Sequence, residues 1–170
     1  MNEIIIKEDK KKAINLIVLG SVFLIIGIYA LAMGAIEKEL FYAIIGAVVV
    51  IVFSAVLISI VKRTLNSTPL LLIGKDGITD MSTLCSVGFL EWKEIQSINI
   101  QKSFGQRYIG LNVYKLNELM KRISITKRIA MKVNLIFRHP PVLILLDTAN
   151  IEFNEAVSLI QMRLVEHRRN

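Results

Sequence analysis

Cysteine, histidine and proline are scarce in this chain of 170 residues, and their scarcity excludes several classes of site. The single cysteine, Cys85, cannot form an internal disulfide, and one cysteine with only two histidines, His139 and His167, cannot assemble a structural zinc site. Three prolines and nine glycines exclude collagen-like and low-complexity classes. We therefore expect a fold held together by the burial of apolar side chains alone.

Charged residues are also few, since they make up 21% of the chain against 54% hydrophobic residues. This balance is too apolar for an ordinary soluble enzyme and excludes a disordered chain. The charges that are present give a net charge of +7. Such an excess suits an anionic partner, either lipid headgroups or nucleic acid.

Two long segments, residues 13–36 and 40–61, carry no charged side chain at all. At about 1.5 Å of rise per residue, either segment can span the roughly 30 Å hydrocarbon core of a bilayer as a helix. Residues 37–39 between them, Glu-Lys-Glu, are too few for more than a tight turn. We therefore predict a hairpin of two transmembrane helices.

A cleaved signal peptide is the alternative interpretation of the first segment, because lysines occupy positions 10–12 and the Ala-Leu-Ala sequence at 30–32 resembles a cleavage site. The apolar region of a signal peptide, however, runs for about 7 to 15 residues. This segment is longer, and a second apolar segment follows almost at once. An uncleaved helix is the prediction that we keep.

Basic residues flank the two segments on the side of the chain ends. Four lysines lie among residues 7–12, and Lys62 and Arg63 follow the second segment, whereas Lys38 stands alone in the turn. Cytoplasmic flanks of membrane proteins are enriched in lysine and arginine. The pattern predicts a multi-pass protein of the inner (plasma) membrane with both termini in the cytoplasm, in which residues 1–12 form a cytoplasmic N-terminal segment.

Glycine recurs every seven residues in the first segment, at Gly20, Gly27 and Gly34. A stripe of such positions lets a second helix approach closely. Small residues of the second segment that could face the stripe are Ala43, Ala47 and Ser54. Packing within the hairpin is our preferred use of the stripe, and a homodimer seam is the alternative. Transport is not predicted, because neither segment contains an ionisable residue for a proton or ion pathway.

The remaining residues, 66–170, predict a separate cytoplasmic domain of the α+β class. The sequence Asn-Ser-Thr-Pro at 66–69 is typical of a linker, and the Asp76-Gly77 step predicts a tight hairpin whose residues have positive φ angles. Strand patterns occupy residues 70–73, 78–82, 86–91, 96–103, 107–113 and 142–146. A helix over residues 154–167 is expected to cover the sheet with a stripe formed by Phe153, Val157, Ile160 and Leu164.

A helical insert is predicted at about residues 115–137, with one apolar face made of Ile125, Ile129, Val133 and Ile136. The same stretch carries six basic residues and no acid from position 121 to 138, and these are Lys121, Arg122, Lys127, Arg128, Lys132 and Arg138. This arrangement is typical of a helix that lies in an anionic headgroup layer. The alternative is that the apolar face packs on the sheet and the charges are its solvated side. Nucleic-acid binding is disfavoured, because aromatic residues are not interleaved with the basic ones.

The order of these features resembles bacterial two-helix membrane proteins with a C-terminal pleckstrin-homology-like domain, an uncharacterised family. The resemblance rests on the order of the elements, on the Gly74-Lys75-Asp76-Gly77-Ile78 hairpin and on the segment that contains Gly88, Trp92 and Ile95. It implies a bent antiparallel sheet of about seven strands, closed at one end by the final helix. It also implies structural roles for Gly88, Trp92 and Ile95, and the hairpin step gives Gly77 a structural role. Six strands are visible in the sequence.

Catalytic machinery is not apparent, because the sequence contains no Gly-x-Ser-x-Gly turn, no phosphate-binding glycine loop and no His-Glu-x-x-His helix. We expect neither an enzyme nor a cofactor. Cys85 is predicted to be a small buried side chain in or beside a strand, and Trp92 is predicted to belong to the core.

Three hypotheses of function remain. The first is a non-enzymatic integral membrane protein whose cytoplasmic domain binds a protein partner or anionic lipid headgroups. The second is an immunity protein that protects its cell against a membrane-active toxin or bacteriocin. The third is a small subunit of an envelope complex.

Overall fold

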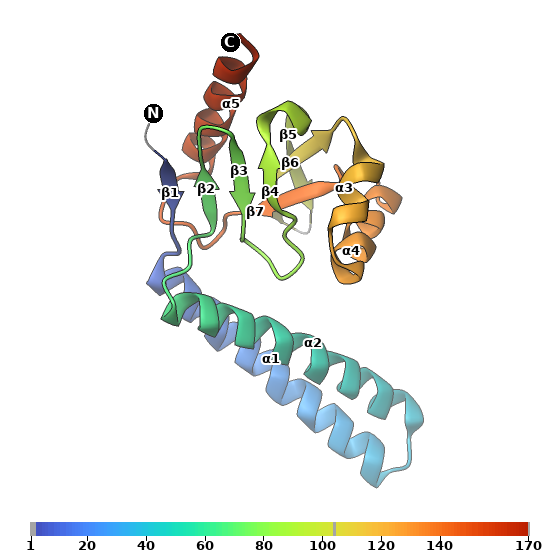
Figure 1. Cartoon of the computed structure of the whole chain (residues 1–170). Helices are drawn as coiled ribbons and strands as arrows, with labels where there is room; N and C mark the ends of the chain where they lie inside the picture. Colours follow the sequence, from blue (N-terminus) through green and yellow to red (C-terminus); the bar gives the residue numbers. More distant parts are fainter. Residues whose placement is uncertain (1–2, 104, 170) are drawn as a thin grey trace. The chain divides into compact units, whose positions relative to one another are not determined.

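The computed structural model describes residues 3–103 and 105–169, which form two compact units. One unit runs from Glu8 to Thr68 and is a helical hairpin. The other combines the residues up to Lys7 with those from Pro69 onward. The predicted α+β class is confirmed, with two long apolar helices, seven strands in two antiparallel sheets within the described residues, and a C-terminal helix (Figure 1).

The hairpin consists of α1 (Lys10–Ile36) and α2 (Leu40–Leu65), joined by the predicted turn at 37–39. Asp9 caps the start of α1, because its carboxylate accepts hydrogen bonds from the backbone N–H groups of Lys11 and Lys12. Both helices are long and apolar enough to cross a bilayer. In the most apolar window of each, only 6% and 11% of the residues are buried, which differs from the core helix of a soluble protein.

Glycines bring the two helices of the hairpin together. In α1 the buried residues are Ala13, Gly20, Gly27 and Gly34. A Cβ atom at Gly34 would collide with the backbone of Ala43. A Cβ atom at Gly27 would meet the side chains of Val49 and Val50, and one at Gly20 would meet the side chain of Leu57. Gly46 of α2 contributes a further close approach, against the backbone of Leu31. The stripe is therefore occupied within the chain.

The base of the hairpin is tied by a polar cluster. The Arg63 guanidinium forms an ion pair with Glu8, and its Nε donates a hydrogen bond to Glu8 Oε1 at 3.1 Å. The Thr64 hydroxyl donates to Glu8 Oε2 at 2.6 Å. The Glu8 and Arg63 side chains are only 5% and 11% exposed, so the pair is partly shielded from water. Such shielding strengthens a charge-assisted interaction.

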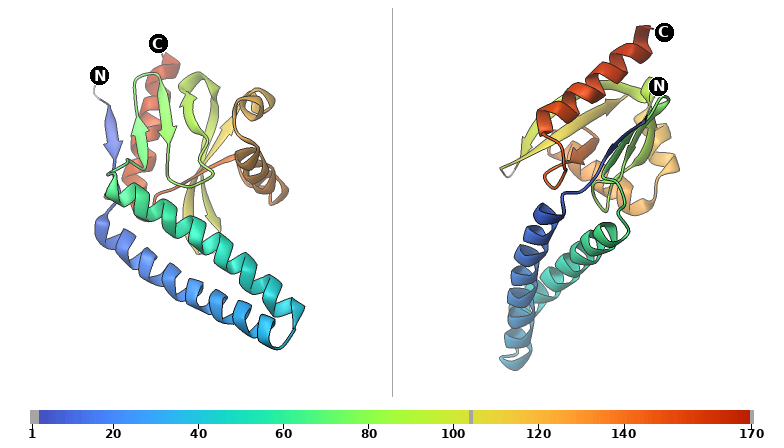
Figure 2. Two further views of the ribbon diagram at one scale, coloured as in Figure 1. Left: turned by 60° about the horizontal axis from the view of Figure 1, so that its bottom comes forward. Right: turned by 90° about the vertical axis from the view of Figure 1, so that its left-hand side faces the viewer.

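The second unit contains two sheets, which Figure 2 shows from two further directions. The first has the strand order β1-β2-β3-β4, and the second has the order β5-β6-β7. Their bounds are β1 (Ile4–Ile6), β2 (Leu71–Ile73), β3 (Gly77–Asp80), β4 (Gly88–Glu91), β5 (Ile95–Ser103), β6 (Gln106–Val113) and β7 (Val142–Leu145). The 3₁₀ helix η1 (Trp92–Glu94) connects the two sheets along the chain. Six of the strands correspond to the six predicted from the sequence.

The seventh strand, β1, comes from before the helical hairpin. Residues Ile4–Ile6 pair antiparallel with Leu71–Ile73 of β2. Residues 1–12, which we expect to form a cytoplasmic N-terminal segment, contain this strand, and the compact unit includes the chain up to Lys7. The contact is reinforced beyond the sheet, because the Lys7 backbone N–H donates to the Asn150 side-chain oxygen and the Asn150 backbone N–H donates to the Lys7 carbonyl.

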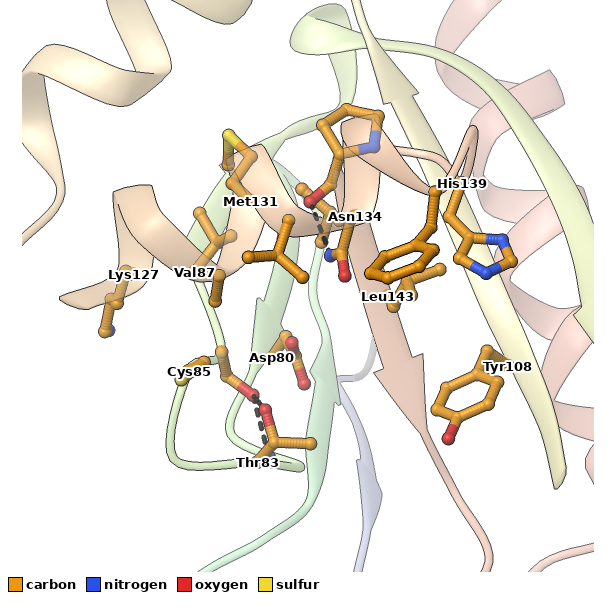
Figure 3. A pocket seen from close by; sticks show the side chains of 16 residues that line it. Asp80, Thr83, Cys85, Val87, Tyr108, Lys127, Met131, Asn134, His139 and Leu143 are labelled. Carbon is orange, nitrogen blue, oxygen red and sulfur yellow. Dashed lines mark hydrogen bonds between the residues drawn. The ribbon is translucent and has the colours of Figure 1, made fainter. Parts of the chain in front are cut away.

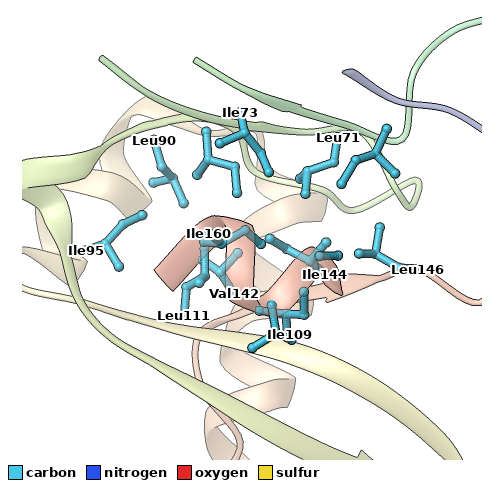
Figure 4. Packing of buried hydrophobic residues seen from close by; sticks show 14 of the residues in the cluster. Leu71, Ile73, Leu90, Ile95, Ile109, Leu111, Val142, Ile144, Leu146 and Ile160 are labelled. Carbon is cyan, nitrogen blue, oxygen red and sulfur yellow. The ribbon is translucent and has the colours of Figure 1, made fainter. Parts of the chain in front are cut away.

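The core of this unit lies between the two sheets and the C-terminal helix α5 (Phe153–Arg169) (Figure 4). Ile6, Leu71, Ile73 and Leu90 contribute from the first sheet, and the second sheet and α5 contribute Ile109, Leu111, Val142, Ile144 and Ile160. The predicted stripe of α5 is buried throughout, with Phe153, Val157, Ile160 and Leu164 at 7%, 5%, 0% and 6% exposure. Burial of apolar surface on this scale is the main stabilising term.

The β2–β3 hairpin forms as predicted, but Gly77 has a different role from the one expected. Its φ is not positive, since the positive-φ glycines among the described residues are Gly88 and Gly105. Instead Gly77 is buried where a Cβ atom would run into the carbonyl of Leu90 on the neighbouring strand. Trp92 and Ile95 are 1% and 0% exposed, and Trp92 Nε1 donates to the Gly74 carbonyl at 3.2 Å.

Candidate functional site

The predicted helical insert consists of two helices, α3 (Leu116–Arg122) and α4 (Ile125–Ile136). The four apolar residues expected on one face of α4 do lie on one face, and that face is exposed. Ile125, Ile129, Val133 and Ile136 are 71%, 57%, 42% and 76% exposed. The alternative in which this face packs on the sheet is therefore wrong. Phe137, directly after the helix, adds a ring that is 68% exposed.

The basic residues around this face have different environments. Arg122 forms an ion pair with Glu94 at 2.7 Å, and Arg128 donates to the carbonyls of Ile123 and Lys121 at the end of α3. Lys121, Lys132 and Arg138 are exposed and form no ion pair with a residue that the structure describes. Lys132 lies one turn from both Ile129 and Ile136, so its cation adjoins the apolar face.

We define the α4 surface as Ile125, Ile129, Lys132, Val133 and Ile136. It combines large apolar side chains with a cation and lies in a stretch, 121–138, that contains no acidic residue. Arg122 and Arg128, although they are held by local hydrogen bonds, keep their positive charge in this stretch. The arrangement is that of an amphipathic helix that can enter an anionic lipid interface, with apolar side chains below the headgroups and cations among them.

The opposite face of α4 lines a cavity of about 470 Å³ (Figure 3). From α4 come Lys127, Ala130, Met131 and Asn134, together with Val133 at the edge of the α4 surface. The loop after β3 and the strands β6 and β7 supply the other walls, and their lining residues include Thr83, Cys85, Tyr108, Val142 and Leu143. The lining is mainly carbon, which is typical of a small-molecule pocket.

Asp80, the last residue of β3, is the buried acid of this cavity. It is 1% exposed, and its Oδ1 accepts a hydrogen bond from the Ser82 backbone N–H at 2.9 Å. Its Oδ2 is buried and has no hydrogen-bond partner among the described residues. Burial raises the pKa of the Asp80 carboxyl, although hydrogen bonds from Ser82 and Ser86 and the positive charge of Lys127 act in the opposite direction.

Several other polar groups of the cavity form hydrogen bonds with neighbouring residues. The Tyr108 hydroxyl donates to Gln106 Oε1 at 2.8 Å, and burial raises the pKa of this phenol. Asn134 Nδ2 donates to the Pro141 carbonyl at 3.2 Å. The hydroxyls of Thr83 and Ser86 are 3.2 Å apart. Asp80 Oδ2 is a buried polar atom whose missing hydrogen bond an occupant could supply.

Cys85 corrects a prediction, because its side chain is exposed. It lies in the loop between β3 and β4, not in a strand, and it lines the cavity. His139 also lines the cavity, at its α4–β7 side. Within the part of the chain that the structure describes, no three His, Cys, Asp or Glu side chains are grouped in a way that could hold a metal ion.

The sequence contains a signal for the burial of the Asp80 side chain. Asp80 follows Ile78 by two positions in a strand, and alternate residues of a strand share a face. Since Ile78 is fully buried, the same face carries an acid into the interior. The sequence has no comparable signal for the Glu8–Arg63 pair, because the two residues are 55 positions apart, one before the first helix of the hairpin and one near the end of the second.

Comparison of the chain with protein-family models, with curated proteins and with solved structures gives no match, so the site is interpreted from its own geometry.

Proposed function

We propose that this chain is a non-enzymatic, multi-pass membrane protein whose globular domain binds the anionic lipid surface through the α4 surface. The observation that carries the proposal is the exposure of Ile125, Ile129 and Ile136 next to Lys132, in a stretch without acidic residues. Large apolar side chains in such numbers on one helix face mark an interaction site. The surrounding positive charge favours anionic lipid over a neutral partner.

Covalent connection supports the proposal. The domain joins the hairpin twice, through β1 before α1 and through β2 after α2. Two apolar helices that hold the domain at a bilayer make its contact with lipid intramolecular, so a weak contact suffices. Each basic residue near an anionic leaflet contributes about 1 kcal/mol, and the contribution decays over a Debye length.

Flanking charges and the fold of the domain support the proposed membrane orientation and the proposed type of domain. The lysines at 7–12 and the pair Lys62 and Arg63 support a cytoplasmic domain at the inner membrane. The two sheets and the C-terminal helix agree with a pleckstrin-homology-like arrangement, in which η1 connects the sheets. A protein partner on the α4 surface is the outcome that the experiment must separate from lipid binding.

The experiment uses the full chain in vesicles. A Cys85→Ser, Ile129→Cys variant carries an environment-sensitive fluorophore at position 129, and the vesicles contain either zwitterionic lipid alone or about one third anionic lipid. We expect a blue-shifted, brighter emission in the anionic vesicles, which reverses at high salt because the attraction is electrostatic.

The matched control carries the same fluorophore at Gln161→Cys, an exposed position on α5. Its emission is expected to be the same in both vesicles. If the fluorophore at position 129 is equally solvated in both lipids and at both salt concentrations, the lipid proposal is wrong and a protein partner becomes the better explanation of the exposed face.

A further inference from the structure

We propose that the cavity between α4 and the sheets binds a small, uncharged, largely apolar molecule with one hydroxyl group, and that this hydroxyl pairs with Asp80 Oδ2. This inference is independent of lipid binding by the α4 surface. The two use largely different faces of α4, because Ile125, Ile129 and Ile136 do not line the cavity, whereas Met131 and Asn134 do. Val133, at the edge of the α4 surface, borders both.

The size and lining of the cavity define the body of the ligand. A volume of about 470 Å³ holds on the order of fifteen non-hydrogen atoms, if each takes the roughly 30 Å³ that a molecule of water occupies in the liquid. Carbon atoms of Val87, Ala130, Met131, Val142 and Leu143 form much of the wall. A hydrocarbon chain or ring fits this lining because it loses no hydrogen bond on entering.

Asp80 defines the polar end of the ligand. Asp80 lies among the side chains that line the cavity (Figure 3). It is 1% exposed, its Oδ1 accepts a hydrogen bond from the Ser82 N–H, and its Oδ2 has no hydrogen-bond partner among the described residues. A buried polar atom without a hydrogen bond is destabilising. An occupant that supplies the missing bond is therefore favoured over a plain hydrocarbon.

A hydroxyl is the group that suits both protonation states of Asp80. When the carboxyl is protonated, its O–H can donate to the ligand oxygen, and when it is ionised, Oδ2 accepts from the ligand O–H. The charge of Lys127, which acts on Asp80, disfavours a second cation in the cavity. An anionic ligand head is disfavoured by Asp80 itself. Both arguments select an uncharged alcohol over an amine or a fatty acid.

Cys85 provides the readout, because it is the one cysteine of the chain, is exposed and lines the cavity. The full chain in zwitterionic nanodiscs is alkylated at Cys85 with a maleimide in the presence of 1-nonanol. The same reaction is run with octyl methyl ether, an isomer that can accept a hydrogen bond but cannot donate one, and with nonylammonium. Thermal unfolding, followed by the fluorescence of Trp92, is measured in parallel.

We expect 1-nonanol to slow the alkylation saturably, by about tenfold, and to raise the unfolding temperature. The amine is expected to do so at least several-fold less effectively, and so is the ether at a pH that ionises Asp80, because the ether cannot donate to the carboxylate. Asp80→Val is expected to remove the preference for the alcohol. Ala130→Phe fills the cavity from α4 and is expected to abolish protection, while Thr126→Phe, at an exposed position of the same helix, retains it.

Three results overturn the inference. An absence of saturable protection and of thermal stabilisation by 1-nonanol would show that the cavity does not bind an alcohol. Equal protection by the ether and the alcohol at a pH that ionises Asp80, or an unchanged preference in Asp80→Val, would show that Asp80 does not anchor the ligand. Undiminished protection in Ala130→Phe would show that the alcohol acts outside the cavity. Because the nanodiscs contain no anionic lipid, none of these results depends on the proposed lipid contact.

Discussion

Ile5 of β1 lies opposite Leu72 of β2 in an antiparallel pair, although the whole helical hairpin separates them in the sequence. The strand before α1 and the strand after α2 therefore belong to the same sheet. A sheet cannot form through a bilayer, so both ends of the hairpin must lie on one side of any membrane that the helices cross. The first sheet is complete only after the chain has passed through both helices.

Burial of β1 leads to a prediction about the stability of the domain. Ile6→Ala is expected to lower the free energy of unfolding by about 2–4 kcal/mol, because Ile6 is 2% exposed and its removal leaves a cavity in the core. Ile5→Ala is the control on the same strand, where the side chain is 48% exposed and the loss should stay below about 1 kcal/mol. Urea unfolding followed by Trp92 fluorescence measures both. Equal losses would contradict a buried β1.

The close approach at Gly34 predicts that the hairpin does not tolerate a larger residue there. Gly34→Val is expected to separate α1 from α2, because a side chain at this position meets the backbone of Ala43. Ala35→Val changes a neighbouring exposed residue and should have no effect. Phe23 and Phe53 stack with centroids 5.1 Å apart, so cysteines at these positions, in a Cys85→Ser background, report the distance by short thiol crosslinking. We expect a several-fold slower crosslinking reaction in Gly34→Val alone.

Charge reversal at Lys132 and at Arg122 should affect two different properties, namely the contact with anionic vesicles and the stability of the domain. Lys132→Glu is expected to weaken the contact with anionic vesicles by roughly tenfold or more while it leaves unfolding unchanged, because two units of charge change at an unpaired site. Arg122→Glu breaks the ion pair with Glu94, and it is expected to destabilise the domain measurably. Unfolding curves and the fluorophore at position 129 separate the two effects. Destabilisation by Lys132→Glu would indicate an additional structural role.

The buried carboxyl of Asp80 predicts a pH dependence of stability. Because burial raises its pKa in the folded chain, the folded state holds the proton at pH values where the unfolded state has lost it. The wild type should therefore lose stability as the pH rises from the ordinary value of 3.8 through the raised value, and the loss should be complete above it. Asp80→Asn removes the ionisation, so its stability relative to the wild type should increase over that window. A stability difference between Asp80→Asn and the wild type that does not change with pH would contradict the raised pKa of Asp80.

Much of this fold can be predicted from local patterns. The two apolar helices, their short turn, six strands and the stripe of α5 all follow from hydrophobic periodicity, because each depends on residues that are close in the sequence. Strand β1 could not be predicted in this way. Its three isoleucines precede a run of lysines without a turn signal, and their partner, β2, lies beyond the hairpin.

The α4 surface was predicted as a pattern but not as an exposed surface. Periodicity places Ile125, Ile129, Val133 and Ile136 together, yet whether such a face meets a sheet or solvent depends on tertiary packing. In this domain Met131 of α4 is buried instead, at 2% exposure. Cys85 was mispredicted because its apolar neighbours suggested a strand, where the chain forms the loop between β3 and β4.

A cysteine scan of α4 in anionic vesicles tests the lipid contact most directly. Single cysteines in a Cys85→Ser background, at positions 125, 126, 129, 132, 133, 134 and 136, carry a fluorophore that a water-soluble quencher can reach. We predict that the fluorophore is protected from the quencher at positions 125, 129, 133 and 136 and accessible to it at position 126. This pattern should be lost in zwitterionic vesicles or at high salt. Uniform accessibility along the helix, or a pattern that is the same in both lipids, would contradict this prediction.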